Sequence, residues 1–537
     1  MKKILLLILA SVAVSLYARS AEPETEDFVP YYKYRVYLKD KGRRTASLMK
    51  HPERYLSARS IERRAKQGLA IDYTDLPVNA KYIRDVAATG VEVLLRSRWN
   101  NTLVVQCEDT TLIDAVRALP CVKEAVQVAH YEKSPLNIDK NRLDRLSQEP
   151  HEPDTSYYAQ GVFQITSLNG LPLHEAGFRG EGMCIAVIDG GFLNSDTIPA
   201  MQNTRIVGTH NFVMPGVSVF DWNNDHGQAV LSCMGTNTPH VMVGTAPEAE
   251  YWLLISEDGN SEQPVEEDNW AAAIEFADSV GADVINSSLG YGSYDAPYGK
   301  IPPYEYNGRT RLVSRTASMA ASKGMVVCCA AGNSGEEILS TIAVPADADN
   351  IITVGSVATI YSKQGKSRDV MFFSSRGGSY DGRIKPDVVC EGLQVIGSNG
   401  TRTFSYGTSI SSPVMCGMVT SLWQALPELT ATPTSPTIHG DTASPTSPRR
   451  GRWARPSPQK RIDAPTINRY VPTSTTEVGT FYMSALSLAT RSDRNPDPSV
   501  RATGRGCSCG VCPPSASKGY APHRQHTSRR YSRDRHR

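Results

Sequence analysis

Hydroxyl side chains are concentrated in the short stretch YGTSISSPV at residues 406–414, which leads into the apolar run MCGMVTSLW. Serine and threonine at the start of a helix often accept hydrogen bonds from its first free N–H groups, so helix capping is one interpretation. The other interpretation is a nucleophile, because backbone N–H groups and the helix dipole favour negative charge at a helix N-terminus. With Ser409 in that role, the chain must also supply a base, a group that orients the base and a further oxyanion donor.

Three other residues match those roles. Asp189 ends the apolar run GMCIAVID, and the two glycines after it let the backbone turn and leave the carboxylate open. His226 precedes a glycine at the start of HGQAVLSCMG, and Asn333 follows an apolar run in CCAAGNSG. Taken singly, the aspartate suits a turn, the histidine the surface and the asparagine a left-handed turn. The order Asp, His, Asn, Ser along one α/β unit is better explained by a serine-nucleophile site.

These motifs give the chain a resemblance to a known family. Residues of about 160–426 resemble a subtilisin-like (S8 family) serine protease of the bacterial secreted type with an N-terminal prodomain. The resemblance is carried by AVIDGGF, DHG, AAGNSG and GTSISSPV, supported by INSSLG at 285–290 and GRIKPDVV at 382–389. Each motif is weak to moderate alone, and their order and spacing make the resemblance specific.

The resemblance implies a serine endopeptidase that hydrolyses peptide bonds in protein or peptide substrates. Ser409 is then the nucleophile, His226 takes its proton and later gives it to the leaving amine, and Asp189 holds the imidazole tautomer. Asn333 and the Ser409 N–H are expected to form the oxyanion hole. The implied substrate-binding residues lie on an edge strand and on a pocket wall: Ser288, Leu289, Gly290, Ala330, Ala331 and Gly332. No cofactor is implied for the chemistry, and structural calcium is an open possibility.

The chain departs from the family pattern at three places. Gln228 stands where the family shows threonine after DHG, and Ile410 and Ser411 replace methionine and alanine in the serine motif. KPDVVCEG replaces KPDVVAPG before it. None of these departures touches a catalytic atom, so they affect the expected pocket shape and efficiency rather than the triad.

The elements that must position these residues are visible as nearly continuous apolar runs after residue 158. GMCIAVID, EYWLLISED, GADVINSSLG, GMVVCCAAGN and NIITVGSVA are typical of parallel strands buried on both faces, with helical stretches between them. We predict a doubly wound, mostly parallel sheet flanked by helices, at residues 151–430. Ligands bind at the carboxyl ends of such strands, where Asp189, Asn286 and Asn333 fall.

Two segments precede this domain. Residues 1–21 have two lysines, an apolar run and small residues, the form of a secretory signal peptide, which predicts a secreted, cell-surface or periplasmic protein. No later run reaches about 18 apolar residues, so no transmembrane segment is expected. Residues 22–150 alternate strand-like and helical runs and predict a small α+β domain. The resemblance makes it an inhibitory prodomain and the chain a zymogen, with a maturation region near 134–157; a permanent accessory domain is the alternative.

Composition changes sharply after residue 430. Residues 431–537 hold 18 Lys and Arg against 6 Asp and Glu, whereas the rest of the chain holds 39 against 49. This Pro-, Ser- and Thr-rich segment predicts a low-complexity basic tail without a core, and we hypothesise that it is read out of frame. A nucleic-acid partner is not expected, because a signal peptide argues against it. Since the tail replaces the segments that close the domain in the family, a non-catalytic or misfolded remnant is the alternative function.

Two further features bear on the site. Five of the 11 cysteines, at 184, 233, 328, 329 and 416, lie inside apolar runs and suit small buried side chains, so few disulfides are expected. CSCGVC at 507–512 lacks a partner pair at metal-binding spacing. The acidic stretch SEDGNSEQPVEEDN at 256–269 has three interpretations: recognition of basic substrate side chains, calcium binding, or, most simply, a solvated loop.

Overall fold

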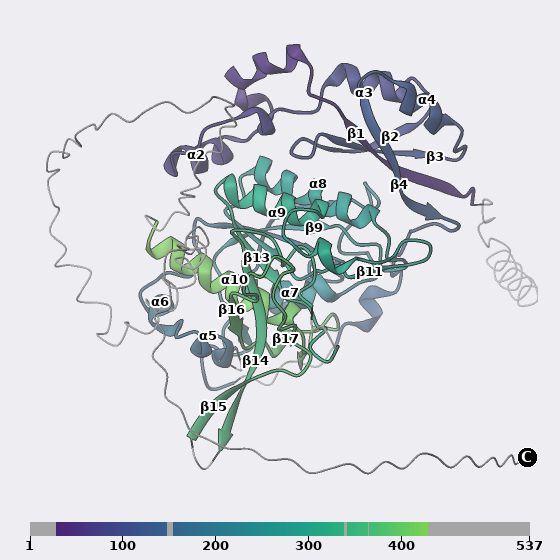
Figure 1. The fold of residues 1–537 in the computed structure, drawn as a ribbon. Helices are drawn as coiled ribbons and strands as arrows, with labels where there is room; N and C mark the ends of the chain where they lie inside the picture. Colours follow the sequence, from purple (N-terminus) through teal and green to yellow (C-terminus); the bar gives the residue numbers. More distant parts are fainter. Residues whose placement is uncertain (1–27, 148–153, 160, 338–340, 363–364, 428–537) are drawn as a thin grey trace, which may run out of the picture. The chain divides into compact units, whose positions relative to one another are not determined.

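The computed structural model describes residues 28–147, 154–159, 161–337, 341–362 and 365–427 (Figure 1). The predicted signal peptide (residues 1–21), the basic tail (431–537) and its CSCGVC motif lie outside these ranges. Within the described ranges, no helix combines the length and apolar character that a membrane crossing needs. All eight described cysteines are free and buried, as expected for those in the apolar runs.

The N-terminal domain, residues 28–131, is the predicted α+β unit. Its antiparallel sheet has the order β2-β3-β1-β4. The strands are β1 (Tyr31–Leu38), β2 (Glu92–Ser97), β3 (Thr102–Cys107) and β4 (Val122–Tyr131). Helices α3 (Ala80–Ala87) and α4 (Leu112–Ala118) cover one face, where Val86 and Ile113 pack against Val36 and Val105 of the sheet.

A segment between β1 and α3 forms an insert in this domain, residues 41–78. It contains α2 (Ala58–Lys66) and three short 3₁₀ segments (Arg43–Lys50, Pro52–Arg54 and Tyr73–Asp75). Helix α2 starts after Ser57, whose hydroxyl accepts a hydrogen bond from the Ser60 N–H, as serine caps commonly do.

The α/β domain, residues 161–427, is built on a sheet of order β15-β14-β13-β10-β5-β9-β6, with β16 also paired to β14. The pairs are parallel except for β14 with β15, which confirms the predicted mostly parallel sheet. Its strands are β5 (Cys184–Asp189), β6 (Arg205–Asn211), β9 (Glu250–Ile255), β10 (Val284–Ser287), β13 (Val326–Ala330), β14 (Ile352–Ser362), β15 (Gly365–Val370) and β16 (Val388–Cys390).

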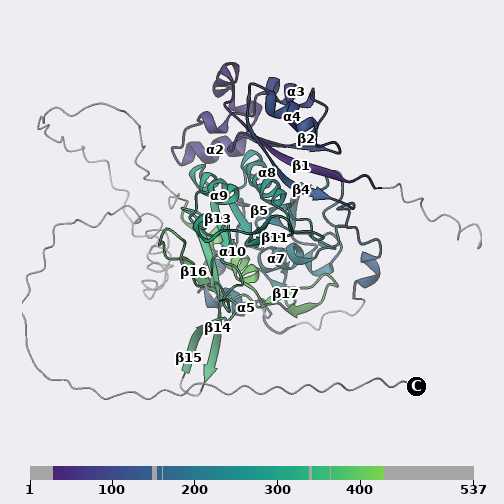
Figure 2. The same cartoon turned by 45° about the vertical axis from the view of Figure 1, so that its right-hand side comes forward.

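Helices cover both faces of this sheet (Figure 2). α7 (His226–Gly235) and α10 (Thr408–Ala425) pack on one face with Ile185 and Val187 of β5. α8 (Val265–Val280) and α9 (Leu312–Ser322) pack on the other with Ala186 and Ile188. Successive side chains of a strand point to opposite faces, so every residue of β5 is buried, as its continuous apolar run predicted.

Short elements connect the main ones. They are α5 (Val162–Ser167), α6 (Leu171–Glu175), β7 (Asn237–Thr238), β8 (Met242–Val243), β11 (Ser293–Tyr294), β12 (Gly299–Lys300), β17 (Gln394–Ile396), β18 (Arg402–Phe404) and the 3₁₀ segments Arg142–Arg145, Pro199–Met201 and Pro303–Glu305.

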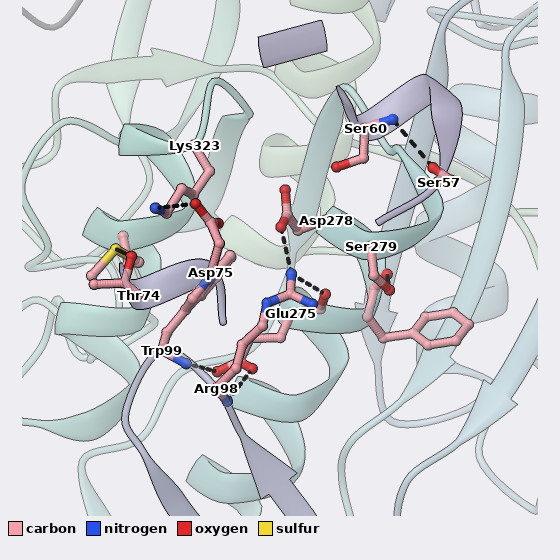
Figure 3. A network of polar contacts seen from close by, with 12 residues as sticks. Ser57, Ser60, Thr74, Asp75, Arg98, Trp99, Glu275, Asp278, Ser279 and Lys323 are labelled. Atoms are coloured by element: carbon pink, nitrogen blue, oxygen red, sulfur yellow. Dashed lines mark hydrogen bonds and ion pairs between the residues drawn. The ribbon is translucent and has the colours of Figure 1, made fainter. Parts of the chain in front are cut away.

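Charged side chains of the N-terminal domain contact α8 and the residue that follows α9 (Figure 3). Asp278 of α8 is fully buried and accepts hydrogen bonds from Arg63, Arg64 (2.8 Å) and Arg98 (2.5 Å). Glu275, one helical turn earlier, accepts bonds from the Arg98 N–H (2.7 Å) and the Trp99 N–H (3.1 Å). These contacts join segments that are more than 170 residues apart in the sequence.

Two more ion pairs extend this contact. Arg35 of β1 binds both oxygens of Asp268 at 2.7 and 2.6 Å, the two-point geometry that favours arginine over lysine. Lys323, just after α9, donates to Asp75 of the insert at 3.0 Å. The N-terminal domain therefore binds α8 through its sheet and binds the ends of α8 and α9 through its insert.

Candidate active site

Asp189 and His226 meet at the carboxyl end of the sheet. Asp189 is the last residue of β5 and is fully buried, while His226 is the first residue of α7. His226 Nδ1 lies 2.6 Å from Asp189 Oδ1, which also accepts the Gly190 N–H at 2.7 Å. A carboxylate only accepts hydrogen bonds, so Nδ1 carries the proton and Nε2 is left as a base. The Asp189 charge raises the pKa of His226 above its ordinary value, although burial acts in the opposite direction.

A glycine and a capping asparagine make this close approach possible. A Cβ at Gly227 would lie 2.7 Å from Asp189 Cβ and 2.6 Å from Gly191 O, so glycine is required after the histidine. Asn224 fixes the start of α7, because its Oδ1 accepts the His226 N–H at 3.0 Å. The sequence analysis missed Asn224; its position two residues before the helix, typical of an Asx turn, was the available signal.

Ser409 is the second residue of α10, and the capping interpretation of its stretch is wrong. The N-cap is Gly407, with φ at 151°, and glycine has no side chain that could cap the helix. A Cβ at Gly407 would lie 2.9 Å from Ser409 Oγ and 3.7 Å from Asn333 Nδ2. Glycine at this position therefore leaves room between the serine hydroxyl and the asparagine amide.

Asn333 is held by its carbonyl oxygen. Its Oδ1 accepts hydrogen bonds from Thr408 N at 3.0 Å and Thr408 Oγ1 at 3.1 Å, and Thr408 Oγ1 accepts the Gly332 N–H at 3.1 Å. With Oδ1 occupied, Nδ2 is the group that remains on the side of Ser409. The left-handed conformation falls on Gly332, with φ at 104°, so the turn interpretation of Asn333 is wrong. Thr408 is a second residue that sequence reasoning missed.

One cavity of about 750 Å³ is lined by Asp189, His226, Asn333 and Ser409. In the described part of the chain, no hydrogen bond joins Ser409 Oγ to His226, a bond that is often long in proteins without substrate. Of the six expected substrate-binding residues, five line the same cavity: Ser288, Leu289, Gly290, Ala330 and Gly332. The sixth, Ala331, is fully buried behind the wall.

Residues 288–290 differ from the expected edge strand. They follow β10 as coil, and they pair with no strand in the described part of the chain. Ser288 connects this segment to the serine motif, because its Oγ donates to Ser409 O at 2.7 Å and accepts from Asn286 Nδ2 at 3.0 Å. Asn286 Oδ1 in turn accepts the Ser412 hydroxyl at 2.9 Å. Asn286, which was expected at a strand end, thus joins Ser288 to α10 and does not line the cavity.

The acidic stretch at 256–269 is not a solvated loop. Its second part is the first turns of α8, and Asp258, Glu266 and Glu267 are buried. Glu257, Asp258, Glu262 and Glu266 line the cavity, and burial raises the pKa of Glu257 and Glu266. Within the described ranges, no group of three or more His, Cys, Asp or Glu side chains is placed to hold a metal ion. Structural calcium stays a prediction.

An Asp–His pair and a helix-terminal serine that share one cavity are typical of serine hydrolases. The model of the subtilase family matches residues 180–449, about half of the chain, and the chain belongs to this family. A model of the peptidase S8 propeptide domain of Bacteroidota matches residues 33–146. The protein is thus a subtilisin-like serine endopeptidase with an N-terminal propeptide, and the propeptide match includes residues 33–131 of the N-terminal domain.

Several characterised proteases are similar to this chain. Serine protease AprX of Bacillus subtilis (strain 168) is 28% identical over 275 residues, which are 47% of this chain and 59% of AprX. Subtilisin DY of Bacillus licheniformis is 29% identical over 275 residues, 49% of this chain and 86% of the relative. Subtilisin E of Bacillus subtilis (strain 168) is 27% identical over 303 residues, which are 54% of this chain and 70% of subtilisin E. The chain therefore spans less than two thirds of AprX.

Proposed function

We propose that this chain is a secreted endopeptidase, made as a zymogen, that cleaves proteins or peptides through Asp189, His226 and Ser409 with Asn333 in the oxyanion hole. The observation that supports this most directly is the 2.6 Å contact of His226 Nδ1 with a buried Asp189, at the same cavity that Ser409 and Asn333 line. The N-terminal domain is its intramolecular inhibitor, and the chemistry needs no cofactor.

The proposed reaction follows from the groups that face the cavity. His226 Nε2 takes the proton of Ser409 Oγ as that oxygen attacks the substrate carbonyl, and Asp189 stabilises the resulting imidazolium. Asn333 Nδ2 and the Ser409 N–H, which lies in the first turn of α10, donate hydrogen bonds to the oxyanion. His226 then gives the proton to the leaving amine, and a water molecule hydrolyses the acyl-enzyme by the same steps in reverse order.

Substrate binding is proposed for the two segments on either side of the nucleophile. Ser288, Leu289 and Gly290 line the cavity, and among the described residues no backbone hydrogen bond occupies their N–H and C=O groups, which suits an extended substrate chain. Ala330 and Gly332 are small residues on the opposite segment and leave space for a substrate side chain. Ala331 supports that wall from behind.

Labelling with a fluorophosphonate probe tests the proposal, because the probe reacts with a serine only when its base and oxyanion hole are formed. Residues 22–537 are compared with Ser409→Ala and with the matched variant Ser411→Ala, which removes a neighbouring hydroxyl that is fully buried. We expect labelling of the native chain and of Ser411→Ala, and none of Ser409→Ala. Absence of labelling in a chain that unfolds cooperatively on heating would favour the non-catalytic alternative.

Export is tested separately. Removal of residues 1–21 should leave the chain inside the producing cells, whereas the complete chain should appear outside the inner membrane and be shorter at its N-terminus.

A further inference from the structure

Gln228, the residue that stands in place of threonine after DHG, is fully buried on α7. Its Nε2 donates to Ile396 O at 2.8 Å and lies 3.2 Å from Met201 Sδ, and both of these neighbours are uncharged. Among the described residues, Gln228 Oε1 is buried without a hydrogen-bond partner. A buried acceptor without a partner destabilises a fold, so stability alone does not explain an amide at this position.

The backbone of Gln228 holds the loop that follows Asp189. The Gln228 N–H donates to Gly191 O at 3.1 Å, and Gly191 is the second residue after Asp189. His226 lies two residues before Gln228, at the start of the same helix. The main chain of Gln228 is therefore linked directly to the segments that carry both members of the Asp189–His226 pair.

The side chain of Gln228 acts together with that of Ser232, about one helical turn further along α7. Ser232 Oγ accepts the Ile396 N–H at 3.0 Å, while Gln228 Nε2 donates to Ile396 O. Residues four apart lie on the same face of a helix, so these two side chains pair with Ile396 much as a neighbouring strand would. Cys233 Sγ lies 3.6 Å from Gln394 O and extends the contact. Side chains of α7 thus bind the backbone of β17.

β17 forms a hairpin with β18, and this hairpin leads into the serine motif. Ile396 of β17 is paired with Arg402 of β18. Just after β18, the Ser405 N–H donates to Leu393 O at 3.0 Å, and Ser409 is the fourth residue beyond Ser405. The amide of Gln228 therefore lies between the helix that carries His226 and the hairpin that precedes the nucleophile.

Apart from the packing of α7 on α10, His226 and Ser409 are held by separate contacts. Asp189 and Asn224 bind His226, whereas the backbone of Ser409 is bound by the Ser288 hydroxyl. No hydrogen bond between the described residues joins the two catalytic side chains themselves. The distance between His226 and Ser409 is therefore set by the spacing of the elements that carry them.

We propose that Gln228 is a positioning residue, whose amide sets the spacing between α7 and the β17–β18 hairpin and so the distance over which His226 takes the proton of Ser409. The inference rests on the proposed function. A displacement of about 1 Å between reacting groups lowers a rate by up to about 10²-fold, and because the amide is one of several contacts we expect a loss of about tenfold in kcat. KM should change little, because Gln228 is fully buried and does not line the cavity.

The test compares Gln228→Met, which keeps the size of the side chain and removes the donor, with the matched control Thr236→Val. Thr236 is fully buried at the other end of α7, and its Oγ1 donates to Ser232 O at 2.8 Å, so the control also loses one buried hydrogen bond. Gln228→Met should lower kcat about tenfold and change KM less than about twofold, whereas Thr236→Val should keep the native kcat. Native kcat in a folded Gln228→Met would overturn the inference and leave the proposed function intact; a native chain that does not react with the fluorophosphonate probe would overturn both.

A second variant tests the inference if Gln228→Met does not fold. Gln228→Glu keeps the shape of the side chain, and burial favours the neutral carboxyl, whose O–H can donate to Ile396 O in place of the amide. The rate of probe labelling, divided by the native rate at the same pH, should be within about threefold of one at about pH 6 and should fall toward about pH 10, as the carboxyl ionises and loses its donor. The division cancels the titration of His226, which both chains share. A ratio that stays constant over this range would overturn the inference.

Discussion

Asp278→Ala is expected to weaken the hold of the N-terminal domain on the α/β domain without affecting catalysis. Asp278 lies on α8 and is fully buried beneath three arginines of the N-terminal domain. It does not line the active-site cavity, and once the N-terminal domain has left, its side chain faces solvent. The substitution therefore separates the inhibitory contact from the chemistry.

The size of the effect follows from the partners that remain. Removing one side of a buried charge pair costs about 3–5 kcal/mol, because the other side is left buried and unpaired. Arg63 keeps a hydrogen bond to Ala282 O, Arg64 keeps Asp75, and Arg98 keeps Glu275 O. We therefore expect the lower end of that range, about 3 kcal/mol, or roughly 10²-fold weaker binding of the cleaved N-terminal domain.

Strong acid should also release the N-terminal domain, because it protonates Asp278 and so removes the charge that the three arginines bind. Burial alone would raise the pKa of Asp278, but Arg98, Arg63 and Arg64 outweigh it and hold the pKa below the ordinary value of 3.8. A carboxyl with a lowered pKa stabilises the complex above its ordinary pKa and loses that contribution as the pH falls through the lowered value. The Asp278 contact should thus persist at pH 5 and fail only in stronger acid.

The assay uses protein whose N-terminal domain has been cleaved from the α/β domain but is still bound to it. After dilution the N-terminal domain dissociates, and the rate of peptide hydrolysis rises as the inhibited enzyme becomes free. Asp278→Ala should reach its full rate about 10² times sooner than the native chain, with the same final kcat/KM. Lys66→Ala is the matched control, because the ion pair that Lys66 forms among the described residues is an exposed one with Glu62 on α2. This substitution should change the release rate less than fivefold. A change in Asp278→Ala no larger than that of the control would refute the reasoning.

Four further outcomes test the site. Asn333→Ala should lower kcat by about 10²–10³ with a small change in KM, measured with a peptide substrate. The acidic limb of kcat/KM against pH should have its midpoint above 6.5, because Asp189 raises the pKa of His226 and only neutral imidazole is a base. Asp189→Asn should remove that shift and lower kcat by about 10⁴, which the same pH profile would show. Gly227→Ala should abolish probe labelling in a chain that still folds, since its Cβ would separate Asp189 from His226; normal labelling would contradict this.

Strong local patterns in the sequence predicted the central elements. The continuous apolar runs identified β5, β9, β10 and β13, and the helix after the serine motif ends at Ala425, where its apolar character stops. β6 was missed because it is an edge strand: exposed and half-buried residues alternate along RIVGTHN, and no apolar run results. Its partner β9 supplies the pairing, which a single segment of sequence does not show.

The contacts between distant segments were not predictable in the same way. Helical runs were expected within residues 22–150, yet the arginines of α2 look like ordinary solvated charges in the sequence. Arg63 and Arg64 are buried because Asp278 lies opposite them, and that pairing spans more than 210 residues. Likewise, the acidic stretch at 256–269 looked solvated because its neighbours in the fold, Tyr291 and Tyr294, are far along the chain. Burial of charge depends on partners that local composition does not reveal.

The elements that carry the site hold one another in place, and this bears on the alternative of an inactive remnant. α10 carries Ser409 and packs against α7, which carries His226, and against β13, which leads to Asn333. α10 also packs closely against the segment after β8, because a Cβ at Gly417 of α10 would lie 2.1 Å from Thr245 Oγ1. A change in the chain after residue 427 therefore acts on the stability of α10 and not on the identity of the site residues. Probe labelling combined with a low melting temperature would identify an active enzyme that lacks closing segments, whereas a stable fold without labelling would identify a remnant.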